Sequence, residues 1–288
     1  MKNALPSPTR ISLRGLYFSS IAIDWTNATH IEMVGFRFDE CVHLLRVAPR
    51  FVQCDFQIVQ PPIQMHELPH DVIMCRSLQW LDYRDRHNAA GFFNLISLPS
   101  LRCLSITPEQ QTLEVFESVT ACLKRSSCPL TFLKISYVEL RDAPLIPLLE
   151  VTPTLEILDL FLVHLSDALF QHLGATAIDV YNQEEDAFLP HLGVIKLWGP
   201  RAYSWTSICD LYQCCDTDDS SSGIFRRECS LDISVSIFSG FDDEAIYIDK
   251  DASALLQALI EDGIDLCITD SRCRSIIKLE EPDDSSEN

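Results

Sequence analysis

The sequence predicts an α/β fold, in which a curved parallel sheet lines the concave side of an irregular solenoid and helices cover its convex side. Three observations support this fold class. A phrase of the form Pro-x-Leu-x-x-Leu-x-Leu recurs along the chain, its apolar positions alternate as they do in a strand, and amphipathic helical stretches fill the intervals. A recurring phrase indicates a recurring structural unit, and such units stack on one another.

The clear copies of the phrase begin at leucine residues, and weaker copies fit between and beyond them. Positions are counted from the first leucine of the phrase, which is position one. The clear copies begin at Leu101, Leu130, Leu155 and Leu192. The weaker copies begin at Pro8, Ala28, Phe51, Leu78 and near Glu228. The starts are about 20 to 37 residues apart, mostly within the period of 20–29 residues that is typical of leucine-rich repeats. Position nine, where such repeats carry Asn or Cys, is Val138 in one copy and Val163 in another, which favours an irregular leucine-rich-repeat solenoid.

Each copy is expected to form a short strand that follows a helix. Leu-x-x-Leu-x-Leu places alternate side chains on one face of an extended segment. The proline just before it cannot continue the preceding helix and biases the chain towards an extended conformation. Strand, turn, helix and return therefore describe one unit of the fold.

Helices are expected in the intervals between the strands. Polar residues that can cap helices are Asp39, Asp142, Ser166 and Asp251. An apolar stripe at helical spacing runs through Leu113, Phe116, Val119 and Leu123. Gly263 stands where a C-terminal cap belongs.

The solenoid is expected to span residues 1–270, with acidic inserts near residues 179–187 and 214–223. Residues 271–288 are polar and acidic, which predicts a disordered tail. Within this tail, Ile277-Lys278-Leu279-Glu280 has the form of a SUMO-conjugation site, so Lys278 is a candidate modification site. The competing interpretation is a tail that only increases solubility.

The composition excludes several classes of protein. The formal net charge is -20 and the isoelectric point is about 4.6, so a nucleic-acid partner is not expected and a basic protein surface is electrostatically favoured. No stretch approaches the roughly 20 apolar residues of a membrane helix. The N-terminus carries no targeting segment, which predicts a cytoplasmic or nuclear location. The 12 cysteines are scattered and are expected to be small buried apolar residues.

Motifs that carry catalysis are absent from the sequence. It contains no glycine-rich phosphate loop, no C-x-x-C pair, no G-x-S-x-G elbow and no H-E-x-x-H pair. We therefore expect no enzyme, no cofactor and no metal site. A hydrolase or transferase on an irregular α/β scaffold remains the alternative.

The residues between the leucines predict a binding surface. Position five of each copy is polar in a consistent column: Ser12, Glu32, Asp55, Asp82, Ser105, Lys134, Asp159 and Lys196. Positions three and seven carry large apolar side chains from Leu78 onward, which is typical of a partner site. The predicted partner-binding residues are Trp80, Asp82, Phe132, Lys134, Ile157, Asp159, Phe161, Lys196 and Trp198. The alternative is that loops cover these side chains or that the register drifts there.

One stretch of the chain resembles a known family. The run LKRSSCPLTFLKI at residues 123–135 is similar to the "ERSSCPLTSLSL" phrase of fungal F-box proteins with leucine-rich repeats, as is Leu165-Ser166-Asp167-Ala168-Leu169. The resemblance covers roughly residues 78 to 200. It implies repeats that hold a ubiquitylation target for an SCF-type ubiquitin ligase, with no catalytic residue. The F-box, which would bind a Skp-type adaptor, is not present in this chain, so an adaptor is expected only if an F-box is missing from this sequence. A truncated fragment without independent function is a further alternative.

Overall fold

The computed structural model describes most of the chain. The described residues are 5–16, 18–60, 71–85, 89–108, 113–136, 142–161, 165–177, 179, 187–199, 202–212, 229–235 and 248–270. The acidic insert near residues 214–223, most of the insert near residues 179–187 and the tail at residues 271–288, including Lys278, lie outside them.

A ten-stranded parallel sheet runs through the described chain, with its strands side by side in chain order. Its strands are β1 (Arg10–Arg14), β2 (His30–Val34), β3 (Gln53–Val59), β5 (Trp80–Asp85), β7 (Cys103–Pro108), β8 (Phe132–Ser136), β9 (Ile157–Phe161), β10 (Val194–Gly199), β11 (Ser230–Val235) and β12 (Leu266–Asp270). The short strands β4 (Ile73–Met74) and β6 (Ile96–Ser97) pair in a separate sheet. Each copy of the predicted phrase has its strand beginning at position three, so the strand predictions are confirmed; β12 has no counterpart among them.

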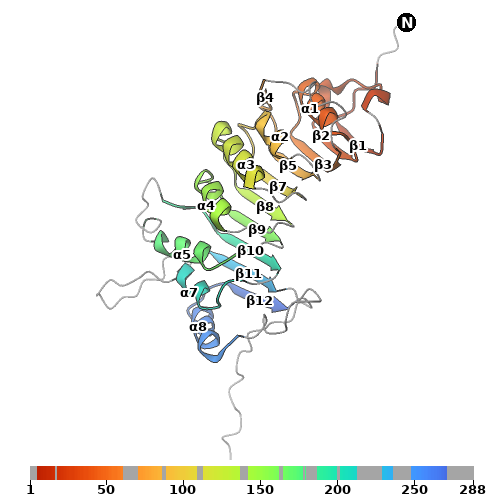
Figure 1. Cartoon of the computed structure of the whole chain (residues 1–288). Coiled ribbons are helices and arrows are strands. Elements are labelled where there is room, and N and C mark those ends of the chain that lie inside the picture. Colours follow the sequence, from red (N-terminus) through yellow and green to blue (C-terminus); the bar gives the residue numbers. More distant parts are fainter. Residues whose placement is uncertain are drawn as a thin grey trace, which may run out of the picture.

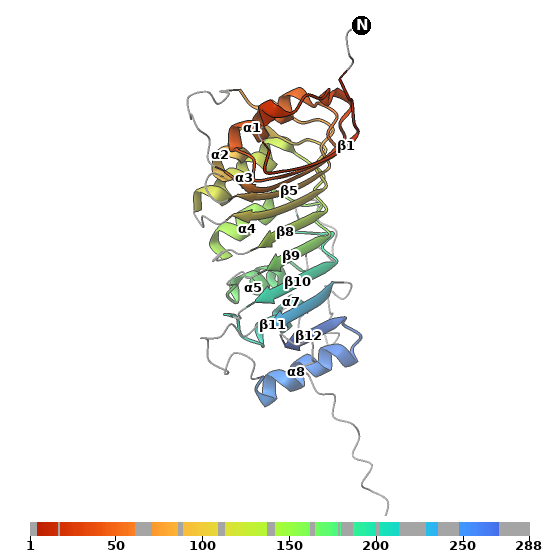
Figure 2. The same cartoon turned by 90° about the vertical axis from the view of Figure 1, so that its right-hand side faces the viewer.

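Helices follow most of the strands. They are α1 (Phe38–Val47), α2 (Ala89–Asn94), α3 (Leu113–Ser126), α4 (Asp142–Glu150), α5 (Ala168–Ala175), α7 (Ser207–Tyr212) and α8 (Lys250–Glu261). Figures 1 and 2 show these helices along one side of the sheet. The fold is therefore mixed α/β with a parallel sheet, as predicted. None of the helices within the described ranges combines the length and the apolar content needed to cross a bilayer.

The core lies between the sheet and the helices and is built from alternate strand residues. Leu104, Leu133 and Leu158 from successive strands are all fully buried. The Tyr83 ring stacks on Phe92 of α2, with ring centroids 4.2 Å apart. Full burial of such a side chain contributes roughly 1.5–3 kcal/mol, so the repeated leucines stabilise every sheet–helix contact along the array.

Three of the predicted helix caps are wrong: Asp39 and Asp251 each lie two residues after the actual cap, and Ser166 lies one residue before the cap of α5, which is Asp167. Helix α8 is capped by Asp249, whose side chain accepts a hydrogen bond from Ala252 N at 2.8 Å, so Asp251 lies inside the first turn. Likewise, α1 begins at Phe38, and Asp39 lies in its first turn. An acidic residue is favourable at the cap and in the first turn, and the sequence alone does not distinguish these neighbours.

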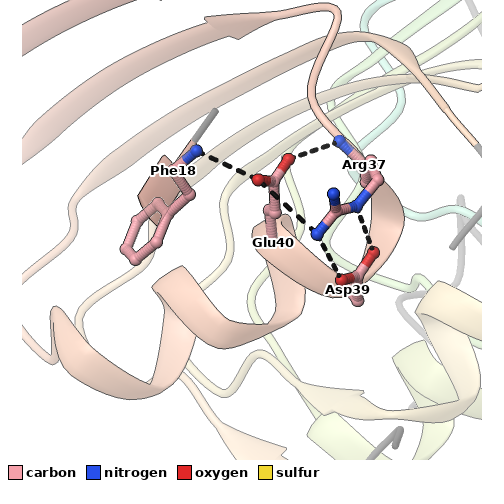
Figure 3. Close-up of polar contacts among 4 residues, drawn as sticks. All are labelled: Phe18, Arg37, Asp39 and Glu40. Atoms are coloured by element: carbon pink, nitrogen blue, oxygen red, sulfur yellow. Dashed lines mark hydrogen bonds and ion pairs between the residues drawn. The ribbon is translucent and has the colours of Figure 1, made fainter. Parts of the chain in front are cut away.

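A polar network fixes the start of α1 (Figure 3). Glu40 is buried, and its carboxylate accepts hydrogen bonds from Phe18 N and from Arg37 N, both at 3.0 Å. The Arg37 guanidinium donates to both Asp39 oxygens, at 3.1 and 3.0 Å, and one of its nitrogens lies 3.7 Å from Glu40. Glu40 thus joins the segment between β1 and β2 to the helix that follows β2.

Candidate protein-binding surface

The side of the ten-stranded sheet that faces away from the helices, here named the front face, displays the other alternate strand residues. Its middle row follows the register of the strands: Ser12, Glu32, Asp55, Asp82, Ser105, Lys134, Asp159, Lys196, Asp232 and Cys267. Every neighbouring pair in this row is a pair of Cα partners, which confirms the predicted column. A shift of one residue would have turned the buried leucines to this side.

Two aromatic pairs stand on the front face. The Trp80 ring stacks with Phe132, with centroids 6.2 Å apart and planes 16° apart. These residues lie on either side of Cys103 in the same row, so their backbones are two strand spacings apart, or roughly 10 Å. The rings are closer than the backbones and therefore lean towards each other across β7.

The second aromatic pair joins the neighbouring strands β9 and β10. The rings of Phe161 and Trp198 have centroids 6.5 Å apart. Trp198 is 37% exposed and Trp80 is 42% exposed, whereas Ile157, between the two pairs, is partly buried. Large apolar side chains that stay accessible on a sheet face are typical anchors of a protein interface.

Ion pairs accompany the aromatic residues. Lys134 Nζ lies 3.1 Å from Asp159 Oδ2, and Arg84 Nη2 lies 2.9 Å from Asp82 Oδ2. Ser105 Oγ donates a hydrogen bond to Asp82 at 3.2 Å. These charged side chains lie on the same strands as the aromatic residues, β5, β8 and β9.

Carboxylates dominate the front face over β2, β3 and β5. Burial raises the pKa of Asp55, and the nearby charges of Asp82 and Glu32 raise it further, while a hydrogen bond from Gln57 opposes the shift. The pKa of Glu32 is lowered instead, because Ser12 and Arg14 donate hydrogen bonds to its carboxylate. Neighbouring carboxylates in one row therefore differ in their electrostatic environment.

A hollow of about 400 Å³ lies beside these carboxylates. Its polar lining includes Arg10, His30, Gln53, Glu32 and Asp55 from β1, β2 and β3. The sequence prediction did not include this hollow among the site residues. The sequence did contain a signal for this hollow. In the weaker copies at Pro8, Ala28 and Phe51, positions three and five are all polar.

The described residues contain no group of three His, Cys, Asp or Glu side chains that is suited to hold a metal ion. Burial raises the pKa of Cys75 to about 12 and that of Cys122 to about 11. Such thiols stay protonated near neutral pH and are therefore weak nucleophiles. The buried cysteines act as apolar core residues.

All the predicted partner-binding residues lie on the front face. The structure brings together Trp80 with Phe132, Lys134 with Asp159, and Phe161 with Trp198. Asp159 differs from Lys134 and Lys196 on the neighbouring strands, because it is only 9% exposed, and its carboxylate pairs with the more exposed Lys134. Arg84 is a front-face residue that the sequence prediction omitted.

Comparison of the chain with protein-family models finds no match, and a search of the curated proteins finds no relative.

Proposed function

We propose that this chain is a non-enzymatic scaffold for protein–protein interaction, built as an irregular leucine-rich-repeat solenoid whose front face holds a protein partner. The observation that carries the proposal is the pair of accessible aromatic contacts, Trp80 with Phe132 and Phe161 with Trp198, with ion pairs on the same strands. Aromatic anchors surrounded by polar groups are the usual energetic centre of an interface.

The repeat period supports the proposed fold. The strands of the ten-stranded sheet run parallel and lie in chain order, and all except β12 begin at the same position of a phrase whose copies start about 20 to 37 residues apart, which fits stacked repeat units. The similarity of residues 123–135 to fungal F-box proteins suggests a more specific role, the recognition of a target for ubiquitylation in the cytoplasm or nucleus. A Skp-type adaptor belongs to this proposal only if a longer form of the protein carries an F-box.

The test compares two double variants of the full chain as baits for affinity capture and quantitative mass spectrometry. Trp80→Ser with Phe132→Ser removes one aromatic pair from the front face. The matched control, Leu113→Ser with Leu255→Ser, removes exposed apolar side chains from helices α3 and α8. We expect the first variant to lose a discrete set of proteins that the wild type and the control both retain.

Stability measurements separate binding from folding in the same experiment. The rings of Trp80 and Phe132 are partly accessible, so their loss is expected to cost about 1–2 kcal/mol of unfolding free energy. Leu104→Ala, on the buried side of the strand between them, is expected to cost roughly 2–5 kcal/mol. Unchanged capture by the aromatic variant would refute the proposed surface, and a cost equal to that of Leu104→Ala would show that the rings belong to the core.

A further inference from the structure

The front face differs in charge from the protein as a whole. The chain has a formal net charge of -20, with 42 acidic residues against 22 basic ones. The charged strand residues of the front face are Arg10, Arg14, Arg84, Lys134 and Lys196 against Glu32, Asp55, Asp82, Asp159 and Asp232. These formal charges cancel, so the acidic excess of the protein lies elsewhere.

In the three front-face ion pairs between described residues, the cation is the more accessible member. The side chains of Arg84 and Asp82 are 49% and 16% exposed, and those of Lys134 and Asp159 are 37% and 12% exposed. The pair of Arg14 and Glu32 has the same order, at 71% and 32%. Long cationic side chains reach past the short carboxylates at their base, so an approaching molecule meets the positive groups first.

On β8 and on β10, a lysine lies two residues from an aromatic residue of the same front-face alternation. Lys134 is in register with Asp159 and lies two positions along β8 from Phe132, and Lys196 lies two positions along β10 from Trp198. Lys196 makes no salt bridge with any residue in the described part of the chain. The accessible chemistry over β8 to β10 is therefore aromatic and cationic.

We propose that the partner docks on the front face through an acidic segment that carries apolar side chains, with its carboxylates over Lys134 and Lys196 and its apolar groups against Trp198 and Phe132. This inference rests on the proposed function and names the class of partner. An acidic segment is repelled by most of an acidic protein and less so at the front face, whose formal charges cancel, so the exposed lysines over β8 to β10 favour docking there. The carboxylate of Asp55, which makes no salt bridge with the described residues, disfavours an acidic segment over β3, whereas Lys134 and Lys196 favour it over β8 to β10.

The acidic character of the chain favours a protein segment over nucleic acid as the occupant. A nucleic acid carries a phosphate charge at every nucleotide, and its long-range repulsion from a protein of net charge -20 exceeds that of a segment with a few carboxylates. An acidic peptide and a nucleic acid can be distinguished by experiment, because both can compete for the same protein in solution.

The test selects random peptides displayed on phage against the full-length chain and sequences the enriched pool. We expect the enriched peptides to contain more Asp and Glu than the starting library, together with aromatic or aliphatic residues. Synthetic copies are then titrated by fluorescence anisotropy against Lys196→Glu, a reversal that breaks no salt bridge. We expect binding to weaken about ten-fold, and to stay unchanged for Lys250→Glu, an exposed lysine at the start of α8.

The other outcomes distinguish a failure of the acidic-partner proposal from a failure of the proposed function. Enriched peptides that are neutral or basic overturn the acidic partner but leave the proposed function standing, provided that Trp80→Ser with Phe132→Ser reduces their binding. Enriched peptides that bind this aromatic variant as well as the wild type overturn the proposed function itself. A labelled oligothymidine that displaces the peptides at lower concentration makes nucleic acid the occupant.

The acidic end of this chain is a third possible occupant of the face. A full-length variant with Glu280, Glu281, Asp283 and Asp284 replaced by Gln or Asn tests it directly. Peptide affinity that is unchanged in this variant supports an external partner. Peptide affinity that rises in this variant makes the chain's own end the competitor and overturns the proposal.

Discussion

Lys134 Nζ lies 3.1 Å from Asp159 Oδ2 and connects neighbouring strands on the front face. The other carboxylate oxygen of Asp159, Oδ1, is buried and receives no hydrogen bond from the described residues. Because a buried carboxylate without partners is costly, Asp159 depends on this lysine. The ion pair is thus part of the folded structure as well as part of the candidate surface.

Replacing Lys134 by Met is expected to destabilise the protein. The substitution keeps most of the aliphatic stem and removes the cation, so Asp159 loses the one ion pair that it makes with the described residues; we expect a loss of about 1–3 kcal/mol in urea denaturation. Lys196→Met is the matched control, since Lys196 is on the same row and makes no salt bridge with the described residues; its effect should stay within about 0.5 kcal/mol. A double-mutant cycle with Asp159→Asn measures the coupling, and additive effects would contradict this account.

Glu40→Ala is expected to loosen the N-terminal part of the fold. The substitution removes the acceptor of two backbone hydrogen bonds, from Phe18 N and Arg37 N, in a buried setting. Two partly buried donors without partners should cost about 1–3 kcal/mol. The Phe18 amide donates to Glu40 in the wild type (Figure 3), so its hydrogen exchange should accelerate in the variant.

Asp39→Ala separates this effect from a loss of charge. Asp39 contacts the Arg37 side chain, is more exposed than Glu40, and accepts neither of the two backbone hydrogen bonds. We expect the Phe18 amide to exchange in the Asp39 variant as it does in the wild type. Equal acceleration in both variants would show that acidic charge near the start of α1, and not the hydrogen bonds, holds the segment.

The register of the sheet could be predicted because a strand has a simple period. Leucines at positions one, four and six and a polar residue at five fix which side chain faces which way, and a shift of one residue reverses every side chain. The strand β12 escaped prediction because Leu266 and Ile268 were its only signal, and two alternating apolar residues fit many structures. The two-residue strands β4 and β6 are too short to carry any period.

The candidate site was predictable as a set of residues and not as an arrangement. The sequence places Trp80 and Phe132 on one face, but the inclination of their rings across Cys103 depends on side-chain rotamers that a linear pattern does not specify. The accessibility of Lys134 relative to Asp159 has the same origin, since side-chain length and packing decide which group of an ion pair is covered. The greater exposure of the lysine therefore follows from the folded arrangement of neighbouring strands and not from the linear sequence.

Asp55 predicts an unusual dependence of stability on pH. Its pKa is raised on folding, first by burial and then by the charges of Asp82 and Glu32, so the folded state binds this proton more tightly than the unfolded state, whose value is near 3.8. Stability from this group is therefore present below pH 3.8 and lost as the pH rises through the folded value. Asp55→Asn cannot ionise, and its amide oxygen can still accept the hydrogen bond from Gln57. We expect this variant to be more stable than the wild type at pH 7, with the advantage shrinking towards pH 4.

Glu32→Gln is a control that is expected to change stability at pH 7 in the opposite direction from Asp55→Asn. The pKa of Glu32 is lowered by hydrogen bonds from Ser12 and Arg14, so its ionised form stabilises the fold above its unfolded value and this contribution is lost as the pH falls through the lowered value. We expect Glu32→Gln to be less stable than the wild type at pH 7, with the difference narrowing in acid. Urea midpoints measured for both variants between pH 4 and pH 7 should therefore diverge from the wild type in opposite directions as the pH rises. If both variants change stability in the same direction, the general negative charge of the protein governs this row, and the individual contacts of Asp55 and Glu32 do not.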